Sequence, residues 1–244
     1  MKKGIFSIKE NIEIAAGTYR MVLEGEKDVN IIPGQFIDIK LDGFTLRRPV
    51  SVCDAYGSKI VICYRTAGEG TAAMREYEAG RKLDVLYGLG NGFDITVCGE
   101  KPLLAGGGIG SAPLYTLATE LAAAGKEVSC VLGFNTAKEV ILADELRALG
   151  VDTRVVTVDG SAGDRGYPSE YLGGDCTYIY TCGPKAMLKG VYSSWNGDGQ
   201  FSFEERMGCG FGACMGCTCK TKEGHKRICK DGPVLYKEEI LWED

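Results

Sequence analysis

Four cysteines near the C-terminus, spaced C-x4-C-x2-C-x11-C, constrain this chain more than any other feature of its sequence. They are Cys209, Cys214, Cys217 and Cys229, and the first three lie in the glycine-rich run GCGFGACMGC. Iron–sulfur proteins of the plant ferredoxin type place three thiolates on one loop at this spacing and bring a fourth from further along the chain. Glycine lets the backbone curl closely round a cluster and direct N–H groups at its sulfur atoms. The segment is therefore predicted to bind an iron–sulfur cluster and to carry single electrons.

Structural zinc is the alternative ligand for the same cysteines. Zinc ribbons usually supply two separate C-x2-C pairs, whereas here the one C-x2-C pair belongs to a triplet. Disulfides are disfavoured because the chain has 11 cysteines, an odd number, and no secretory signal. Cys219 adjoins the triplet but breaks its spacing, and it is interpreted as a bystander.

The composition is that of an ordinary globular protein. The chain has 244 residues, 45% of them hydrophobic and 25% charged, which is enough for two domains. A formal net charge of -5 disfavours nucleic acid as a partner, because phosphate binding requires a basic surface. The N-terminal segment alternates apolar and polar residues, and no apolar run is long enough to cross a membrane. We expect a cytoplasmic protein with no membrane partner.

The first 98 residues carry the pattern of a small antiparallel β-barrel. Turn signals such as Asp42-Gly43 and Tyr56-Gly57 separate short runs with strand-like composition. These runs cover residues 4–14, 18–24, 35–40, 50–54 and 59–64. Several short strands at this spacing favour a barrel.

From residue 101 the pattern changes to strands alternating with helices. Strands are expected near residues 102–105, 127–134, 153–158 and 177–182, and helices near residues 112–124, 138–149 and 184–195. This alternation implies a parallel sheet, whose ligands bind beyond the carboxyl ends of its strands. We therefore expect a multidomain α+β and α/β protein. Its parts are a barrel at 1–98, a parallel-sheet α/β domain at 99–202 and a small cluster domain at 203–244.

Glycine-bearing turns follow two of the predicted strands. The turn Gly106-Gly107-Gly108-Ile109-Gly110 opens a helix near Ser111, where a pyrophosphate fits over the helix N-terminus. It departs from G-x-G-x-x-G at Ser111, and Asn135 rather than an acid ends the next strand, so a turn without a ligand is the alternative. The run Cys182-Gly183-Pro184 ends a second strand. The two turns are expected to line one crevice.

Two segments of the barrel region are predicted to bind phosphate. The run Arg47-Arg48-Pro49-Val50-Ser51 places guanidinium groups at the start of a strand, and arginine binds phosphate in a planar, bidentate manner. A solvated basic turn is the alternative. Further along, Cys63-Tyr64-Arg65 ends a strand, and Gly70 and Thr71 open a short helix expected at 71–77, whose N-terminus suits a phosphate.

The order of these motifs resembles that of the ferredoxin reductase-like flavoproteins over residues 4–200. The matching motifs are R-P-x-S, Y-R-x-x-G-x-G-T, G-G-G-I-G-x-A-P and C-G-P. With the C-terminal E-E-R-M-G-C-G-x-G-A-C-M-G-C, the chain resembles the electron transfer subunits of NAD-dependent, class B dihydroorotate dehydrogenases. The resemblance implies FAD and a 2Fe-2S cluster as cofactors, NAD(H) as cosubstrate, and a role in pyrimidine (UMP) biosynthesis. It also implies an FMN-containing catalytic partner that oxidises dihydroorotate, in a heterotetramer of two plus two chains.

The resemblance assigns a role to each motif. It implies that FAD is held by Arg48, Pro49, Val50, Ser51, Cys63, Tyr64, Arg65, Gly70 and Thr71. It implies that Gly106 to Gly110 receive NAD(H), and that Cys182, Gly183 and Pro184 shape the meeting place of nicotinamide and flavin. Relatives usually carry an aromatic residue at the position of Val50, so Tyr64 is the candidate to replace its stacking. Because no Arg or Lys cluster immediately follows Phe134, NADH is favoured over NADPH.

No catalytic acid or base is expected on this chain, because hydride transfer to a flavin requires none. The single histidine, His225, is expected in an exposed hairpin turn. The apolar residues Phe211, Ala213 and Met215 either face the partner or pack round the cluster. Two other functions stay open: a reductase subunit of the ferredoxin or sulfide dehydrogenase type, in which one ligand is often aspartate, and a zinc-stabilised binding protein.

Overall fold

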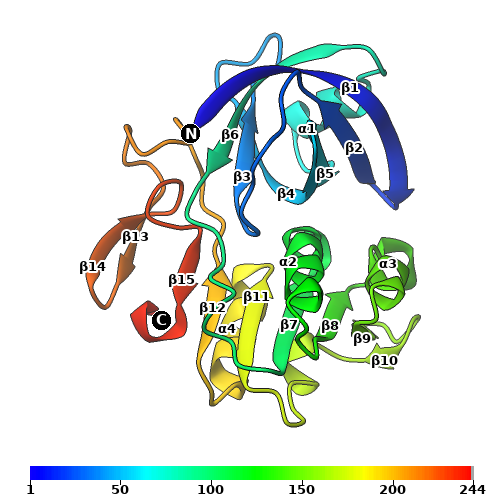
Figure 1. Ribbon diagram of the computed structural model, residues 1–244, viewed down its shortest axis with the longest axis vertical. Helices are drawn as coiled ribbons and strands as arrows, with labels where there is room; N and C mark the ends of the chain where they lie inside the picture. Colours follow the sequence, from blue (N-terminus) through cyan, green and yellow to red (C-terminus); the bar gives the residue numbers. More distant parts are fainter. Residues whose placement is uncertain (243–244) are drawn as a thin grey trace.

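The computed structural model describes residues 1–242, and its N-terminal part is a closed six-stranded barrel (Figure 1). Its strands are β1 (Lys2–Ala15), β2 (Thr18–Glu24), β3 (Phe36–Ile39), β4 (Arg48–Tyr56), β5 (Lys59–Arg65) and β6 (Lys82–Leu89), in the order β1-β2-β5-β4-β3-β6. All neighbouring strands are antiparallel, which confirms the predicted barrel. The short helix α1 (Glu69–Arg75) follows β5.

The sixth strand, β6, was not predicted from the sequence. Its pairing with β3 shifts register between Phe36 and Asp38, and both Val85 and Leu86 are buried. Val85 belongs to the barrel core and Leu86 to the buried cluster on the outer face, so both faces of this part of β6 are buried. The alternation of buried and exposed residues by which a strand is recognised is therefore lost.

The side chains of β3 connect two different parts of the protein. Ile37 and Ile39 point into the barrel core. Phe36 lies on the opposite face, where it belongs to the same buried cluster as Cys217 and Ile228 of the C-terminal segment. Because successive side chains of a strand point to opposite faces, Asp38 shares the outer face with Phe36.

The second part is a seven-stranded sheet covered by helices. Its strands are β7 (Pro102–Gly107), β8 (Ser129–Phe134), β9 (Asp152–Thr157), β10 (Asp164–Arg165), β11 (Tyr178–Cys182), β12 (Gly199–Ser202) and β15 (Val234–Tyr236), in the order β10-β9-β8-β7-β11-β12-β15. All pairs are parallel except β12 with β15. The helices are α2 (Ala112–Ala123), α3 (Ala143–Ala148) and α4 (Lys185–Ser194). None of the helices in the described part of the chain has the length and apolar character needed to cross a bilayer.

The helix predicted for 138–149 is interrupted. A single 3₁₀ turn, η2 (Ala137–Glu139), comes first, and α3 begins only after Leu142. Leu142 has a φ of 62°, in the left-handed region, and Val140 is extended, so the two pieces cannot join. The interruption brings Glu139 close to the end of β8.

The C-terminal segment is divided between its own hairpin and the edge of the sheet. The hairpin consists of β13 (Thr218–Thr221) and β14 (Gly224–Arg227), and His225 is exposed on β14, next to the turn. The chain then returns as β15 beside β12. Asn91, in the connection that follows the barrel, donates to Val234 O (2.7 Å) and accepts from Val234 N (3.1 Å). These bonds tie the linker to the C-terminal segment.

Candidate functional site

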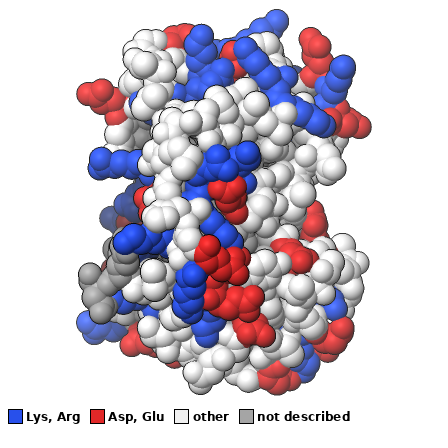
Figure 2. All heavy atoms as spheres, turned by 90° about the vertical axis from the view of Figure 1, so that its left-hand side faces the viewer, with Lys and Arg blue, Asp and Glu red and all other residues white. Residues whose placement is uncertain are grey.

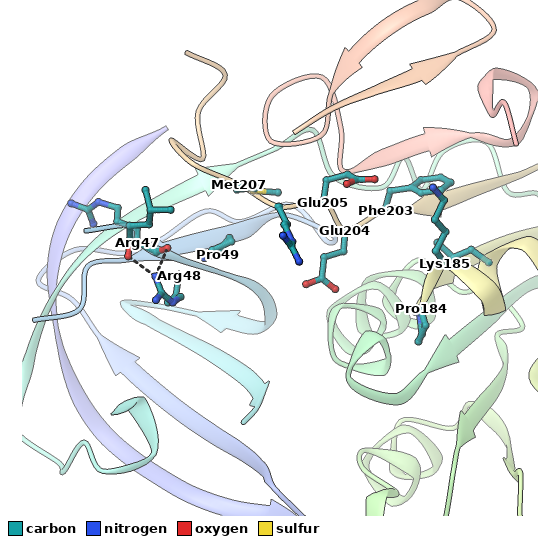
Figure 3. Close-up of a pocket in the computed structure, with 13 residues that line it drawn as sticks. Arg47, Arg48, Pro49, Pro184, Lys185, Phe203, Glu204, Glu205 and Met207 are labelled. Carbon is teal, nitrogen blue, oxygen red and sulfur yellow. Dashed lines mark hydrogen bonds between the residues drawn. The ribbon is translucent and has the colours of Figure 1, made fainter. Parts of the chain in front are cut away.

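A cavity of about 790 Å³ lies where the barrel, the sheet and the C-terminal segment meet (Figure 3). The barrel contributes residues 46–49, the start of α4 contributes 183–185 with Leu188, and the connection after β12 contributes 203–207. The volume lies within the range of about 300–1,000 Å³ that is usual for small-molecule sites. The segment 203–207 leads directly into the cysteine loop, so the cavity and the loop adjoin along the chain.

The two basic and glycine motifs of the barrel are in direct contact. A Cβ atom at Gly70 would lie 2.1 Å from Arg48 Nε, so only glycine allows the backbone to approach this guanidinium so closely. The Arg48 guanidinium also donates to Leu46 O (2.6 Å) and lies 4.8 Å from the centre of the Phe44 ring. Thr71 Oγ1 accepts from Ala67 N (2.9 Å) and so fixes the loop before α1. Through these contacts, the segment around Arg48 and the segment at Gly70 and Thr71 lie side by side in the barrel.

The two glycine-bearing turns of the sheet also meet. Strands β7 and β11 are parallel neighbours, with Gly106 opposite Cys182. A Cβ atom at Gly110 would lie 2.5 Å from Cys182 O, and one at Gly183 would lie 3.1 Å from Gly107 Cα. The turns therefore lie against one another at the carboxyl ends of adjacent strands, and the second of them, at Gly183 and Pro184, lines the cavity. That both turns line one crevice stays a prediction.

The nucleotide turn contains a buried hydroxyl group without a partner. Ser111 is fully buried, and its Oγ has no hydrogen bond within residues 1–242. It lies against the backbone of Gly106, where an added Cβ would come within 2.9 Å of Oγ. Buried polar groups are normally hydrogen-bonded, so this hydroxyl and the start of α2 fit a phosphate-bearing ligand.

Arg48 and Pro49 are the predicted flavin-site residues that line the cavity. Its lining does not include Val50, Ser51, Arg65, Gly70 or Thr71, and Cys63 and Tyr64 lie inside the barrel wall. Tyr64 is buried, stacks on Tyr19 with a centroid distance of 5.6 Å and donates its hydroxyl to Asn11 Oδ1 (2.8 Å). Burial raises the pKa of Tyr64 to about 12. Cys63 is buried in the cluster that contains helix α2. Tyr64 packs in the same barrel cluster as Val50, and its expected stacking on the flavin stays a prediction.

Sequence reasoning missed the connection after β12. Phe203 is the aromatic side chain that lines the cavity, and Glu204 and Glu205 lie between the barrel arginines and Lys185 in Figure 3. The E-E-R-M motif, immediately before the cysteine loop, was the available signal. The sequence alone gives this motif no place in the fold, because β12 has only four residues and its pairing with β11 is a tertiary contact.

The four predicted cluster ligands are arranged as two pairs. The thiols of Cys209 and Cys214 interact with one another, as do those of Cys217 and Cys229. No group of three His, Cys, Asp or Glu side chains in residues 1–242 is arranged to hold a single metal ion, so the thiols do not form a closed quartet. A two-iron cluster takes two thiolates per iron, and two adjacent pairs suit this requirement better than one tetrahedral zinc site.

Backbone N–H groups of the loop point at its first sulfur atom. Cys209 Sγ accepts from Ala213 N (3.2 Å) and from Cys214 N (3.4 Å). Burial alone raises the pKa of Cys209, but donation from backbone N–H groups outweighs burial and lowers it to about 6. The loop reaches this shape through left-handed φ angles of 75° at Gly210 and 92° at Gly212. The chemistry of the loop therefore fits a negatively charged iron–sulfur centre.

An antiparallel barrel with a basic motif, packed on a parallel sheet with glycine turns, defines a ferredoxin reductase-like flavoprotein, here extended by an iron–sulfur segment. A solved NADH-dependent reduced ferredoxin–NADP oxidoreductase superimposes with a TM-score of 0.87 at 27% identity, covering 97% of this chain and 90% of that one. A flavohemoglobin from Malassezia yamatoensis shares the fold, with a TM-score of 0.67 at 19% identity over 80% of this chain and 56% of that one.

Comparison with curated proteins identifies one family within the ferredoxin reductase-like flavoproteins. The family model for the iron–sulfur cluster binding domain of dihydroorotate dehydrogenase B matches residues 204–241. The dihydroorotate dehydrogenase B (NAD(+)) electron transfer subunit of Bacillus velezensis is 40% identical, with 98% of this chain and 99% of the relative covered. That of Fusobacterium nucleatum is 38% identical, with 96% of each covered. The chain belongs to the family of dihydroorotate dehydrogenase B electron transfer subunits.

Membership of this family confirms the predicted activity and cofactors. The chain is an oxidoreductase subunit that transfers electrons in pyrimidine biosynthesis, and it uses FAD, NAD(H) and an iron–sulfur cluster. Its family also implies a catalytic partner subunit.

Proposed function

We propose that this chain carries electrons between NAD(H) and an FMN-containing catalytic subunit, through FAD in the cavity and a 2Fe-2S cluster at the four cysteines. The cavity itself carries the proposal. It is bounded by the arginines of the barrel, by the turn after β11 and by the segment that continues into Cys209. One site thus adjoins the turn after β11 and, along the chain, the cysteine loop. When bound, FAD accepts a hydride from NADH and releases its electrons singly.

The proposal divides the chain into three working regions, with FAD on 1–98, NAD(H) on 99–202 and the cluster on 203–244. We assign FAD to Arg48, Pro49, Val50 and Ser51 and to Arg65, Gly70 and Thr71, with Cys63 and Tyr64 supporting them from within the barrel wall. The Arg48 contact with Gly70 supports this assignment, because it joins the two motifs in one place.

We assign NAD(H) to the turn Gly106-Gly107-Gly108-Ile109-Gly110, with Ser111 as a hydrogen-bond donor to the pyrophosphate. Cys182, Gly183 and Pro184 shape the place where nicotinamide meets flavin. Their contacts with the first turn support this assignment, because they put both turns at one edge of the sheet. No residue of this chain is assigned as a catalytic acid or base.

The proposal includes a preference for NADH over NADPH. No acidic residue directly follows β8 in the sequence, but the side chain of Glu139 reaches this end of the strand. Glu139 Oε2 accepts hydrogen bonds from Asn135 N (3.2 Å) and from Asn135 Nδ2 (2.9 Å). An acid at this edge binds the ribose 2′-hydroxyl of NADH and repels the 2′-phosphate of NADPH.

The catalytic partner is proposed to dock beside the cluster. Phe211 and Met215 flank the ligands and are 44% and 55% exposed, which supports a role in contact with the partner over packing round the cluster.

On the face that carries the C-terminal segment, Lys and Arg are interspersed with Asp and Glu, so this face lacks the continuous basic surface that nucleic acid requires (Figure 2). We propose an assembly of two catalytic and two electron transfer chains in the cytoplasm, whose reducing conditions suit free thiols.

The proposal is tested by coexpressing the chain with an FMN-containing dihydroorotate dehydrogenase subunit. We expect copurification in a two-plus-two assembly, flavin and iron–sulfur absorbance, and NAD-linked oxidation of dihydroorotate. The chain alone is expected to oxidise NADH with an artificial electron acceptor and to leave dihydroorotate unchanged. A colourless protein that contains stoichiometric zinc would refute the proposal.

A further inference from the structure

Asp38 carries a buried carboxylate on the outer face of β3. It is only 2% exposed, and within residues 1–242 its Oδ1 is both inaccessible to solvent and without a hydrogen bond. Burying an unpaired charge costs free energy of folding, so buried carboxylates are normally paired or hydrogen-bonded. We therefore looked for the group that the Asp38 carboxylate faces in the fold.

The carboxylate faces the cysteine loop. Asp38 shares the outer face of β3 with Phe36, which packs in one cluster with Cys217 and Cys229. A Cβ atom at Gly210 would lie 2.4 Å from Asp38 Oδ2, so the Asp38 carboxylate touches the backbone of the residue next to Cys209. The left-handed φ of 75° at Gly210 is part of this approach.

The two nearest arginines are engaged elsewhere. Arg47 Nη2 donates to Asp84 Oδ1 (2.8 Å), and its Nη1 donates to the backbone carbonyl groups of Asp38 (3.2 Å) and Asp84 (2.9 Å). Arg48 donates to Leu46 O. Both guanidinium groups attract the Asp38 carboxylate at a distance, but neither forms an ion pair with it among the described salt bridges. The Asp38 carboxylate also interacts electrostatically with Cys209, the first cysteine of the loop that it touches.

We propose that Asp38 is a residue that tunes the iron–sulfur cluster, by holding a negative charge against the cysteine loop and so lowering the reduction potential of the cluster. The inference rests on the proposed assignment of Cys209, Cys214, Cys217 and Cys229 as ligands. A nearby negative charge in a poorly solvated site disfavours an added electron, and charge and burial are among the factors that set such potentials. A cluster of lower potential releases its electron more readily to the next acceptor.

The test is a redox titration of the assembled complex, with the reduced cluster followed by electron paramagnetic resonance. Burial raises the pKa of Asp38 to about 6, so the titration is run at pH 8, where the carboxylate is ionised. In the isosteric variant Asp38→Asn, the ratio of reduced to oxidised cluster at a fixed potential should rise about tenfold, which corresponds to an upward shift of about 59 mV for a one-electron couple. Asp38→Glu, which keeps the charge, should stay close to the native potential.

Asp42→Asn is the matched control, because it removes the same charge from an Asp side chain of the barrel that is 85% exposed. It should leave the cluster potential unchanged. If Asp38→Asn does not assemble, Asp38→Ala is titrated instead, with the same shift expected. An unchanged potential in the neutral variant, or an equal shift in Asp38→Glu, overturns the inference. Absence of an iron–sulfur signal in the native complex would instead overturn the proposed function.

Discussion

Arg65 of the barrel and Glu139 of the parallel sheet form an ion pair, with Arg65 Nη2 3.1 Å from Glu139 Oε1. The other oxygen of the same carboxylate accepts two hydrogen bonds from Asn135, at the end of β8. Glu139 thus connects the residue that ends the nucleotide strand to an arginine assigned to FAD. Its side chain is 17% exposed, so Glu139 lies partly open to solvent at this strand end.

The first prediction concerns cosubstrate choice. Glu139→Gln keeps the size of the side chain but removes the charge that repels a 2′-phosphate. We expect the preference for NADH over NADPH, measured as the ratio of kcat/KM for reduction of an artificial acceptor, to fall about tenfold, which corresponds to about 1.4 kcal/mol. Glu145→Gln, an exposed substitution on α3, is the control and should leave the ratio unchanged. An unaltered ratio in Glu139→Gln would remove this residue from the ribose site.

The second prediction concerns FAD. Gly70→Ala places a methyl group where it would lie 2.1 Å from Arg48 Nε, so the Arg48 guanidinium must move. We expect FAD affinity, measured by equilibrium dialysis of the apoprotein, to weaken about tenfold or more, while the fold is retained by circular dichroism. Gly68→Ala is the control, because an added Cβ there meets nothing within 4 Å. Equal affinity in the two variants would show that the Arg48 contact is unimportant for FAD.

The third prediction concerns the nucleotide turn. Gly110→Ala would bring a methyl group to 2.5 Å from Cys182 O, a backbone atom that cannot yield as a side chain does. We expect the KM for NADH to rise at least tenfold with FAD content unchanged. Gly173→Ala, at a position where an added Cβ is unobstructed, should behave as the native protein. A native KM in Gly110→Ala would contradict the close packing of the two turns.

The fourth prediction concerns retention of the cluster. Arg227 Nη1 donates to Gly212 O (3.0 Å) in the cysteine loop, and Arg227 Nε donates to Asp231 Oδ2 (2.9 Å), close to Cys229. Arg227→Ala removes both bonds and so loosens the loop around the ligands. The cluster should bleach several times faster in the presence of a chelator. Lys222→Ala, exposed in the turn of the hairpin, should bleach at the native rate.

The sequence predicted those parts of the fold that are set by local patterns. The barrel strands up to β5 and the strands β7, β8, β9 and β11 follow from runs of residues bounded by turn signals. Strand β6 was missed because both of its faces are buried, Val85 in the barrel core and Leu86 in the outer cluster. Strand β15 was missed because its partner, β12, is more than 30 residues away. The interrupted helix was missed because the left-handed Leu142 has no sequence signal comparable to glycine or proline.

At the candidate site, sequence motifs identified the residues that lie at strand ends. They did not identify the side chains that tertiary structure brings to these strand ends from other parts of the chain. Arg48, Gly70 and the turns at Gly106 and Gly183 were recognised because their residue types carry the chemistry. Phe203 and Glu204 were missed because the cavity wall forms only when three distant segments meet. Glu139 was missed because its carboxylate reaches back to Asn135.

The measurement that tests the central claim most directly is rapid-mixing absorbance spectroscopy of the assembled complex carrying Cys217→Ser, with Cys219→Ser as the control outside the ligand spacing. After mixing with NADH, the account predicts that FAD is reduced at close to the native rate in both variants. Reduction of the partner's FMN should be slowed at least a hundredfold in Cys217→Ser alone. Reduction of FMN at the native rate in a Cys217→Ser complex that lacks the cluster would contradict the account, because electrons would then reach the partner without passing the four cysteines.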